Sequence, residues 1–494
     1  MGPHAVFRFD ASPGIGSGHG VRSLALAQRL ADAGWRVSVA ASSETFETVA
    51  VPGPMRRVLL AESPRDEAAR IGSEAGSADL LVVDHYGRDA RFETACRAWA
   101  RRILAIDDLA DRPHDCDVLL DQILGRREGD YRALVPAGCR LLLGPRFALL
   151  RPEFAALRAA SLARRQPPRL KRILVSMGGT DPHDVAATAV RGILQSGLPV
   201  EVDVALGTAA STALCSAAGE GRARVRILPR AGNMAELMAE ADLAIGAGGV
   251  TSWERCCMGL PALVVVTAGN QKTVAARLAE TGAIRLLGAH GEVEPERIAT
   301  AIRELSDDPE ALKRMSGAGR DVCDGKGVRR TSAVLAGSKM DRRGRAVTLR
   351  LAELEDTWRI FSWQIAPGVR RHMTNPEVPT EAEHLAWMSA KLDDPRGWFC
   401  MIESAGSPAG VLRLDEDETD PTRYVVAILV APDQAGRGVG HAALRIAGRL
   451  LSGIHLVARV AAENSASLRV FAKAGYIMEA DGLFHHRAEQ ETRT

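Results

Sequence analysis

Short apolar runs alternate with amphipathic stretches through the first third of the chain. The stretch 21–33 carries apolar residues at helical spacing, as a helix that packs on a sheet would. Several apolar runs end directly in polar residues, as at Asp84 and Asp121, which is typical of the carboxyl ends of strands in a doubly wound parallel sheet. The pattern therefore predicts a Rossmann-like α/β domain over residues 1–165. Its expected strands are residues 5–9, 37–41, 80–83, 103–106 and 118–120.

A polar stretch with two prolines, residues 163–170, interrupts this pattern before a second series of the same kind begins. We expect this series to form a second Rossmann-like domain over residues 166–336. If the two domains face each other across a cleft, their glycine-rich loops would lie on the same ligand. The expected strands are residues 172–176, 200–205, 225–228, 243–246 and 262–266.

The pattern changes again after a polar and basic stretch, residues 337–346, which is predicted to be a linker. A helical stretch with Trp358 and Trp363 comes first, and apolar strands then precede a helix at 441–451. Strands in series followed by a helix predict a separate α+β domain over residues 347–488, with a tail at 489–494. The expected strands are residues 398–403, 410–414 and 424–430.

Composition narrows the range of partners. The chain has 494 residues, too many for one ordinary core, and its net charge of +2 argues against a nucleic acid or an anionic membrane as the main partner. Its eight cysteines show no paired CxxC spacing, so we expect no zinc site and a reducing compartment. No secretory signal and no apolar run long enough to cross a membrane is evident, which predicts a cytoplasmic protein.

The first candidate for chemistry is a glycine-rich loop, residues 14–20, between the first strand and the first helix. Strand, glycine loop and helix in this order direct backbone N–H groups at an anion. His19 in the loop titrates near neutral pH, so we expect the loop to face a phosphorylated substrate and His19 to act in the reaction. The alternative is a histidine that merely begins a helix; the flanking glycines and the nearby Arg22 favour a functional role.

A second glycine pair, Gly248-Gly249, opens a helix in the second domain, where Glu254 follows about one and a half turns later. Glycine-rich turns are common in α/β proteins, so the pair alone is weak evidence. Glu254 adds to it, because a carboxylate there can accept two hydrogen bonds from a ribose diol while the helix N-terminus holds phosphates. Residues 84–86 also follow a strand, although they could be only a capping aspartate and two half-buried rings.

Taken together, these motifs match a family. The first 335 or so residues resemble the UDP-sugar hydrolase of pseudaminic acid biosynthesis, which is related to the GT-B glycosyltransferases. The resemblance is fairly specific because four separate groups of residues occur in the family's order. These are residues 7–10 with 16–19, residues 84–87, residues 177–181 and residues 270–271.

This resemblance implies two Rossmann-like domains in a GT-B arrangement and hydrolysis of UDP-2,4-diacetamido-2,4,6-trideoxy-β-L-altropyranose to the free sugar and UDP. Water would attack the anomeric carbon with inversion, and no metal would be required. His19 corresponds to the general base, Tyr86 to an active-site tyrosine, and Asp10 belongs to the catalytic set. The implied substrate-binding residues are Gly18 and Arg22 near the base, Asn233 and Met234 at the uracil, Gly249, Val250, Thr251 and Ser252 at the phosphates, Glu254 at the ribose, and Asn270 and Gln271 at the sugar or diphosphate.

The third domain resembles the GNAT acetyltransferases, which use acetyl-CoA as a co-substrate. Residues 434–440 match the loop that holds the cofactor pyrophosphate, since they follow a strand and open a helix. Two positions depart from the family: Phe471 stands where many members have a tyrosine acid, and Val425 where many have a glutamate. The acid and base of this domain are therefore unassigned. The implied acetyl-CoA-binding residues are Val430, Gln434, Gly436, Arg437, Gly438, Gly440 and Asn464.

The resulting hypothesis is a bifunctional enzyme that acts on consecutive intermediates of one sugar pathway. The acetyltransferase domain would acetylate the 4-amino group of a UDP-amino-sugar, and the hydrolase would then release the diacetamido sugar. Two alternatives remain: a glycosyltransferase that passes the sugar to an acceptor, and a nucleotide-sugar sensor with a degenerate GNAT module. Release of UDP without an acceptor would separate hydrolysis from transfer.

Overall fold

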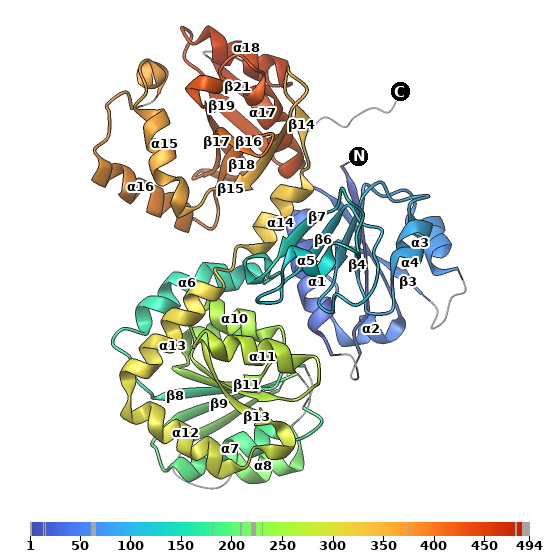
Figure 1. Ribbon diagram of the computed structural model, residues 1–494, viewed down its shortest axis with the longest axis vertical. Helices are drawn as coiled ribbons and strands as arrows, with labels where there is room; N and C mark the ends of the chain where they lie inside the picture. The colour runs from blue at the N-terminus through green and yellow to red at the C-terminus, as the bar shows by residue number, and fades with distance from the viewer. Residues whose placement is uncertain are drawn as a thin grey trace. The chain divides into compact units, whose positions relative to one another are not determined.

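The computed structural model (Figure 1) describes residues 2–12, 14, 16–60, 66–179, 181–207, 210–218, 224–229, 231–373, 375–479 and 482–486. It divides into two compact units. One holds residues 5–28 and 37–328 with two parallel sheets, and the other holds residues 329–494 together with 1–4 and 29–36. The predicted tail, residues 489–494, lies outside the described residues.

The first sheet has seven parallel strands in the order β3-β2-β1-β4-β5-β6-β7. The strand order reverses direction between β1 and β4, which pair side by side, and such a reversal opens a crevice at the carboxyl ends of the strands. Both central strands are buried along their whole length. The strands are β1 His4–Phe9, β2 Arg36–Ala41, β3 Arg56–Leu59, β4 Leu80–Asp84, β5 Ile103–Ile106, β6 Val118–Asp121 and β7 Arg140–Leu143.

Helices pack their apolar faces against this sheet. In one core, Ile71 of a helix packs with the apolar side chains of β4, β5 and β6. The helices are α1 Gly18–Asp32, α2 Ser43–Thr48, α3 Glu67–Ala75, α4 Ala90–Cys96, α5 Glu128–Tyr131, the short η1 Pro145–Phe147, and α6 Pro152–Arg164.

The second sheet has six parallel strands in the order β10-β9-β8-β11-β12-β13, so its reversal lies between β8 and β11. Separate apolar cores lie on its two faces, one with α7 and α12 and one with α9, α10 and α11. The strands are β8 Arg172–Ser176, β9 Glu201–Leu206, β10 Arg224–Pro229, β11 Leu243–Ala247, β12 Ala262–Val266 and β13 Ile284–Ala289. The helices are α7 Val185–Ser196, α8 Thr212–Ala218, α9 Met234–Glu240, α10 Thr251–Cys257, α11 Gln271–Glu280, η2 His290–Glu292, α12 Pro295–Asp307 and α13 Pro309–Val322. The next helix, α14 Gly327–Leu335, belongs almost wholly to the other compact unit.

The third sheet has eight strands in the order β14-β15-β16-β17-β18-β19-β21-β20, and its strands are antiparallel except for the pair β18–β19. That parallel pair joins only residues 423–425 to 455–457, although β18 continues to Val430. The two strands therefore part beyond Val425. The strands are β14 Lys339–Met340, β15 Ala346–Leu351, β16 Trp398–Ser404, β17 Ser407–Asp417, β18 Asp420–Val430, β19 His455–Arg459, β20 Ile477–Met478 and β21 Leu483–His486.

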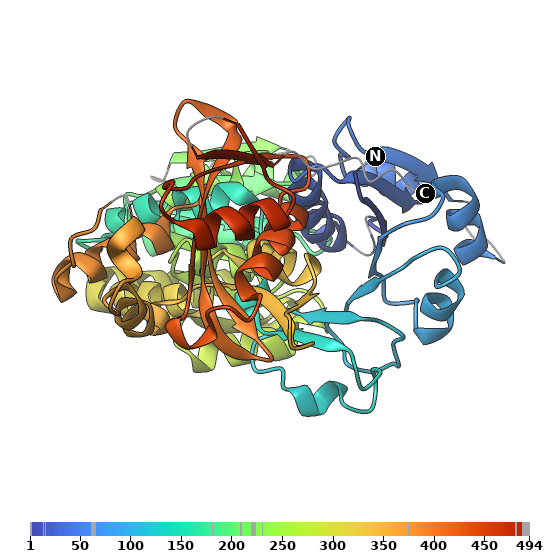
Figure 2. The ribbon, with the colours of Figure 1, turned by 90° about the horizontal axis from the view of Figure 1, so that it is seen from above.

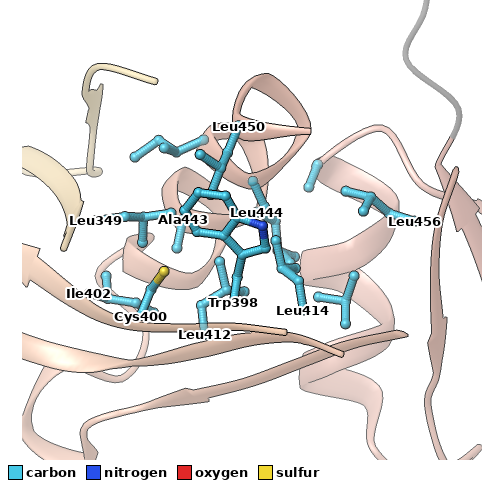
Figure 3. Close-up of a cluster of buried hydrophobic side chains, with 14 of the residues drawn as sticks. Leu349, Trp398, Cys400, Ile402, Leu412, Leu414, Ala443, Leu444, Leu450 and Leu456 are labelled. Atoms are coloured by element: carbon cyan, nitrogen blue, oxygen red, sulfur yellow. The ribbon is translucent and has the colours of Figure 1, made fainter. Parts of the chain in front are cut away.

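Helices cover both faces of this sheet, and alternate side chains of β16 serve the two cores. Trp398, Cys400 and Ile402 pack with the helix α17 (Figure 3), whereas Phe399 and Met401 pack with α15 and α16. Figure 2 shows the strands and the red helices of this unit from a second side. The helices are η3 Leu354–Asp356, α15 Thr357–Gln364, η4 Val369–His372, α16 Glu381–Asp393, η5 Pro432–Gln434, α17 Val439–Leu450 and α18 Ser465–Lys473.

The stretch 337–346, predicted as a linker, contains structure of its own. Lys339 and Met340 form β14, which pairs antiparallel with the first residues of β15. Asp341 in the connecting turn is buried and accepts hydrogen bonds from the N–H groups of Arg343 and Arg345. This part of the chain is therefore an edge hairpin of the third sheet, and the linker prediction is wrong for it.

Within the described parts of the chain, no helix combines the length and the apolar character that a membrane crossing needs. All eight cysteines are free thiols, and Cys116 and Cys139 bring their sulfur atoms within 3.6 Å of each other. The described residues also contain no group of three or more His, Cys, Asp and Glu side chains suited to a metal ion.

Candidate functional site

A cavity of about 1030 Å³ lies in the unit that holds the two parallel sheets. Loops from the carboxyl ends of both sheets line it, including Gly14 and Gly16–His19 of the first glycine loop and Gly248–Thr251 of the second. The two sides meet closely: a Cβ atom on Gly18 would lie 3.2 Å from Val250, and one on Gly179 would lie 2.7 Å from the Ser17 hydroxyl. Of the predicted site residues, Gly18, His19, Arg22, Tyr86, Met234, Gly249, Val250, Thr251, Glu254, Asn270 and Gln271 line the cavity.

His19 is the second residue of α1 and is 8% exposed. Its Nδ1 atom lies 3.7 Å from the Asp84 carboxylate, and its ring meets the Tyr86 ring edge-on with centroids 4.6 Å apart. Burial lowers the pKa of His19 below its usual value, and Asp84 offsets this effect only in part. The imidazole is therefore neutral at pH 7 and able to accept a proton.

Asp84 ends β4 and is fully buried, yet its charge is balanced. The guanidinium of Arg22 donates two hydrogen bonds to it, at 2.8 and 2.6 Å, and the Ser23 hydroxyl donates a third at 2.9 Å. Burial alone would raise the pKa of Asp84, but Arg22 and His19 outweigh it and hold that pKa below its usual value. Both donors come from the first turns of α1, so the loop that carries His19 is also tied to the neighbouring strand.

Tyr86 connects the two sides of the cavity. Its hydroxyl lies 3.4 Å from the carboxylate of Asp108 and also interacts with the side chain of Asn270, the residue before α11 in the second domain. Burial and the Asp108 charge raise the pKa of Tyr86 to about 12, so the phenol stays protonated and can donate a hydrogen bond.

Asp108 is a cavity residue that the sequence analysis did not assign to the site. Its carboxylate accepts a hydrogen bond from Arg22 at 3.0 Å and is placed beside Tyr86. A signal was present, since Asp108 is the second residue after the predicted strand that became β5, at the edge of the sheet where ligands bind.

Asp10 is not among the residues that line the cavity. Its carboxylate is bonded to His85 Nε2 at 2.7 Å and to the guanidinium of Arg8, and Arg8 also donates to Glu67. Burial opposes ionisation of Asp10, but His85 and Arg8 together hold its pKa well below the usual value. The structure thus places Asp10 in an ion-pair network beside the site, and its catalytic role stays a prediction.

Glu254 is 4% exposed and lies in the wall of the cavity on α10. Its carboxylate lies 4.0 Å from the guanidinium of Arg151, and among the described residues no hydrogen bond to this carboxylate is found. Burial raises the pKa of Glu254 to about 7, an effect that Arg151 opposes. A buried carboxylate with open acceptor capacity is suited to a ligand that brings hydroxyl groups.

Other predicted contacts of the second domain are arranged differently. Ser252 is buried and bonded to Arg255 at 3.0 Å, and Asn233 is exposed and bonded to Glu236; neither lines the cavity. The Oε1 atom of Gln271 accepts hydrogen bonds from Gly248 N–H at 3.2 Å and from Thr267 N–H and hydroxyl at 3.1 Å. Gln271 therefore shapes the second glycine loop. Of the predicted turn 177–181, residues 177–179 line the cavity and Thr180 lies outside the described residues.

The third domain has a candidate cofactor loop where the sequence predicted it. Gly436 and Gly438 have φ angles of 75° and 87°, and α17 begins at the next residue. Positive φ values of this kind let successive N–H groups face one anion, so the loop fits a pyrophosphate. The loop lies at the end of β18, beyond the point where β18 and β19 part.

Side chains of the remaining predicted cofactor residues support this loop and its neighbours. A Cβ atom on Gly440 would lie 3.2 Å from Val430, so α17 packs closely on the end of β18. The Oε1 atom of Gln434 accepts a hydrogen bond from Arg437 at 3.0 Å. Asn464 caps α18, because its Oδ1 atom accepts from the N–H of Ser467 at 3.1 Å.

The two positions that depart from the acetyltransferase pattern do not supply a titratable group. Phe471 is buried and lies edge-on to Tyr476, with ring centroids 5.0 Å apart. Val425 is part of the parallel pair with β19. The hydroxyl of Tyr476 is buried and has no hydrogen-bond partner among the described residues, and burial raises the pKa of this phenol.

Comparisons with known proteins give the domain types. Residues 185–325 match the glycosyltransferase family 28 C-terminal domain, and residues 346–477 match the acetyltransferase (GNAT) domain. The chain therefore combines Rossmann-like domains of the GT-B type with a C-terminal GNAT-type domain, as the sequence analysis expected.

Curated relatives match part of this chain. The spore coat polysaccharide biosynthesis protein SpsG of Bacillus subtilis is 30% identical over 226 residues, which is 44% of this chain and 64% of that protein. The UDP-2,4-diacetamido-2,4,6-trideoxy-beta-L-altropyranose hydrolase of Campylobacter jejuni is 32% identical over 177 residues, 36% of this chain and 60% of that protein. The chain thus spans less than two thirds of the length of each.

Among solved structures, MurG of Acinetobacter baumannii aligns with 67% of this chain and 98% of its own, with a TM-score of 0.47 and 16% sequence identity.

Proposed function

We propose that the unit with the two parallel sheets hydrolyses a UDP-linked 2,4-diacetamido-2,4,6-trideoxy sugar of the altropyranose type, and that the C-terminal domain acetylates the 4-amino group of its precursor. The observation that supports the hydrolase proposal best is the position of His19. This histidine is buried and neutral. It lies in the same cavity as the second glycine loop, which leads into α10, the helix that carries Glu254. The 32% identity to the Campylobacter jejuni hydrolase supports the choice of substrate.

His19 would act as the general base. A water molecule held by its ring nitrogen would lose a proton to the imidazole as the oxygen attacks the anomeric carbon. Asp84 beside the ring would keep the histidine oriented and would stabilise the imidazolium that forms, while Arg22 holds the Asp84 carboxylate in place. A positioned base of this kind contributes about 10²–10⁴ in rate.

The leaving group would be UDP, and groups of the second domain would stabilise its negative charge. Backbone N–H groups of residues 249–251 face a diphosphate in this proposal, and Glu254 accepts hydrogen bonds from the ribose diol. The protonated Tyr86 and the amide of Asn270, which contact each other across the cavity, would bind the sugar or the diphosphate.

The C-terminal domain would transfer an acetyl group from acetyl-CoA. The amine nitrogen of the UDP-amino-sugar attacks the thioester carbon, coenzyme A leaves as the thiol, and the nitrogen loses one proton. Support comes from the match to the GNAT domain and from the positive φ angles of Gly436 and Gly438 in the loop before α17. An amino sugar loses its proton near neutral pH, so the reaction does not depend on a strong base at Phe471 or Val425.

One assay tests both parts. The purified protein is incubated with the 4-amino UDP-sugar, with and without acetyl-CoA, and UDP, free coenzyme A and the acetylated sugar are measured. We expect coenzyme A release first and UDP release only after acetylation. In ¹⁸O-labelled water the released UDP should carry no label, because the water oxygen bonds to the sugar carbon.

The alternative outcomes are distinct. If UDP appears only when an acceptor alcohol is added, the protein is a glycosyltransferase, an option that the family 28 match keeps in view. Binding of UDP-sugar and acetyl-CoA with no product of either kind would instead indicate a sensor.

A further inference from the structure

The carbonyl groups of the proposed pyrophosphate loop are bonded to a residue from outside the loop. When a loop directs its N–H groups toward an anion, some of its carbonyls point away from the anion. Those carbonyls need hydrogen-bond donors from elsewhere. The carbonyl of Arg437 accepts a hydrogen bond from the backbone N–H of Arg342 at 2.9 Å, and the carbonyl of Gly436 accepts one from Arg342 Nη1 at 3.3 Å. Both bonds come from the turn between β14 and β15.

The stem of Arg342 also packs against the loop. A Cβ atom added to Gly438 would lie 2.8 Å from Arg342 Cγ, so the side chain covers the glycine from one side. Arg342 therefore contacts three consecutive residues of the loop, 436–438, through its main chain, its stem and its guanidinium.

The turn that presents Arg342 is rigidly built. The buried carboxylate of Asp341 accepts hydrogen bonds from Arg343 N–H at 2.8 Å, and from Arg345 N–H and Nε at 3.0 Å each. The Asp341 N–H in turn donates to the Arg345 carbonyl at 2.9 Å. Arg345 then reaches the loop itself, since its Nη2 atom donates to Gln434 Oε1 at 3.3 Å.

We propose that Arg342 is a positioning residue for acetyl-CoA: by binding the outward carbonyls of Gly436 and Arg437, it fixes the loop with its N–H groups toward the cofactor pyrophosphate. The proposal rests on the acetyl transfer proposed above. Arg342 acts through the loop and does not contact the reacting atoms.

Substitution by alanine should weaken acetyl-CoA binding. In Arg342→Ala the backbone N–H bond to Arg437 stays, but the bond to Gly436 and the packing on Gly438 are lost. Loss of one hydrogen bond from a charged donor corresponds to about a tenfold weaker affinity. We expect the Kd and the KM for acetyl-CoA to rise about tenfold, with kcat at saturating acetyl-CoA and the KM for the amino sugar unchanged.

Arg343→Ala is the matched control. Arg343 is the next residue, is exposed and carries the same charge, but only its backbone N–H takes part in the turn. It should leave the KM for acetyl-CoA unchanged. Arg342→Lys keeps the stem and a cationic donor and should recover part of the affinity.

Four results would overturn the proposal. Equal losses in Arg342→Ala and Arg343→Ala would mean that only long-range charge matters. A fall in kcat at saturating acetyl-CoA would mean that Arg342 acts on the reaction and not on cofactor binding, and a melting temperature lowered in proportion to the lost affinity would assign it to folding alone. If the unsubstituted protein binds no acetyl-CoA while it releases UDP from the diacetamido sugar, the proposed acetyl transfer itself is wrong, and Arg342 loses this role with it.

Discussion

Around His19, acidic and basic side chains lie close together, so that their opposite charges balance. Asp84 is buried within 3.7 Å of the imidazole, and the two hydrogen bonds from Arg22 prevent its charge from pulling a proton onto the ring. Desolvation then keeps the histidine neutral, which is the state that a base requires. Asp108 accepts a hydrogen bond from Arg22 and lies beside the Tyr86 hydroxyl, so its charge is balanced in the same way.

Replacement of His19 by alanine should separate catalysis from binding. We expect the rate of UDP release from the diacetamido sugar to fall by about 10²–10⁴, because the general base is removed. The Kd of UDP, measured by titration calorimetry, should change little, since the proposed uridine contacts lie in the second domain. If affinity for UDP falls as steeply as turnover, His19 binds the nucleotide and is not the base.

Glu254 should make UDP binding depend on pH. Its pKa is about 7, so the carboxylate is largely protonated at pH 6 and ionised at pH 8, and only the ionised form accepts two hydrogen bonds from the ribose diol. We expect the Kd of UDP to decrease as the pH rises through 7. Glu254→Gln, which cannot ionise, should bind UDP more weakly and lose most of this pH dependence; an unchanged profile in the variant would contradict the ribose contact.

The sequence predicted which residues line the cavity better than it predicted the hydrogen bonds that those residues form. His19, Tyr86 and Glu254 were found because each follows a recognisable strand-and-loop pattern, and all three line the cavity. The bonds of Ser252 to Arg255 and of Gln271 to Gly248 were not predictable. They depend on which rotamer fits a packed environment, and no spacing in the chain encodes that.

At the scale of elements, β15, β19, β20 and β21 of the third sheet were not predicted at all. In the two parallel sheets the central strands were predicted within a residue or two, while β3, β7 and β13 were missed. All three lie at sheet edges. Edge strands are short and partly exposed, as in Arg56–Leu59, where only Val58 is buried. Such a segment lacks the continuous apolar run by which a buried strand is recognised. β14 escaped notice for the same reason and was taken for a linker.

The two glycine loops show what elements from different sheets achieve together. Gly18 faces Val250 and Gly179 faces Ser17; a methyl group would be tightly packed at Gly18 and would clash with the Ser17 hydroxyl at Gly179. His19, the proposed base on α1, and the proposed nucleotide-binding residues of α10 therefore line one cavity.

The close approach of the two loops can be tested by adding a methyl group at Gly179. In Gly179→Ala the new Cβ would lie 2.7 Å from Ser17 Oγ, so either the Ser17 side chain must turn away or the two loops must move apart. We expect UDP release to slow by about tenfold or more, since displacements of about 1 Å in a catalytic group cost up to two orders of magnitude.

Two further variants make this result specific. Gly14→Ala adds the same methyl group where the nearest atom is 3.9 Å away and should be tolerated. Adding Ser17→Ala to Gly179→Ala removes the clashing oxygen and should restore most of the rate. Failure of this rescue would mean that Gly179 matters for a reason other than the contact with Ser17.

At the scale of the whole molecule, the chain carries two sets of candidate residues in two compact units. Gly438→Trp should abolish acetyl transfer, because a side chain there would strike Arg342 and the φ angle of 87° is unfavourable for any residue but glycine. UDP release from the diacetamido sugar should persist. His19→Ala should show the reverse pattern in the paired assays, and loss of both activities in either variant would argue against independent sites.

The hairpin formed by β14 and β15 limits where such a chain could have been joined or could be divided in evolution. Residues 337–346 look like neutral spacer in the sequence, yet Asp341 and Arg342 belong to the fold and to the proposed cofactor loop of the third domain. A gene fission at residue 346 would give an acetyltransferase that still has every family motif but lacks the donor to its pyrophosphate loop. A lineage that separates the two enzymes should therefore keep the hairpin with the acetyltransferase.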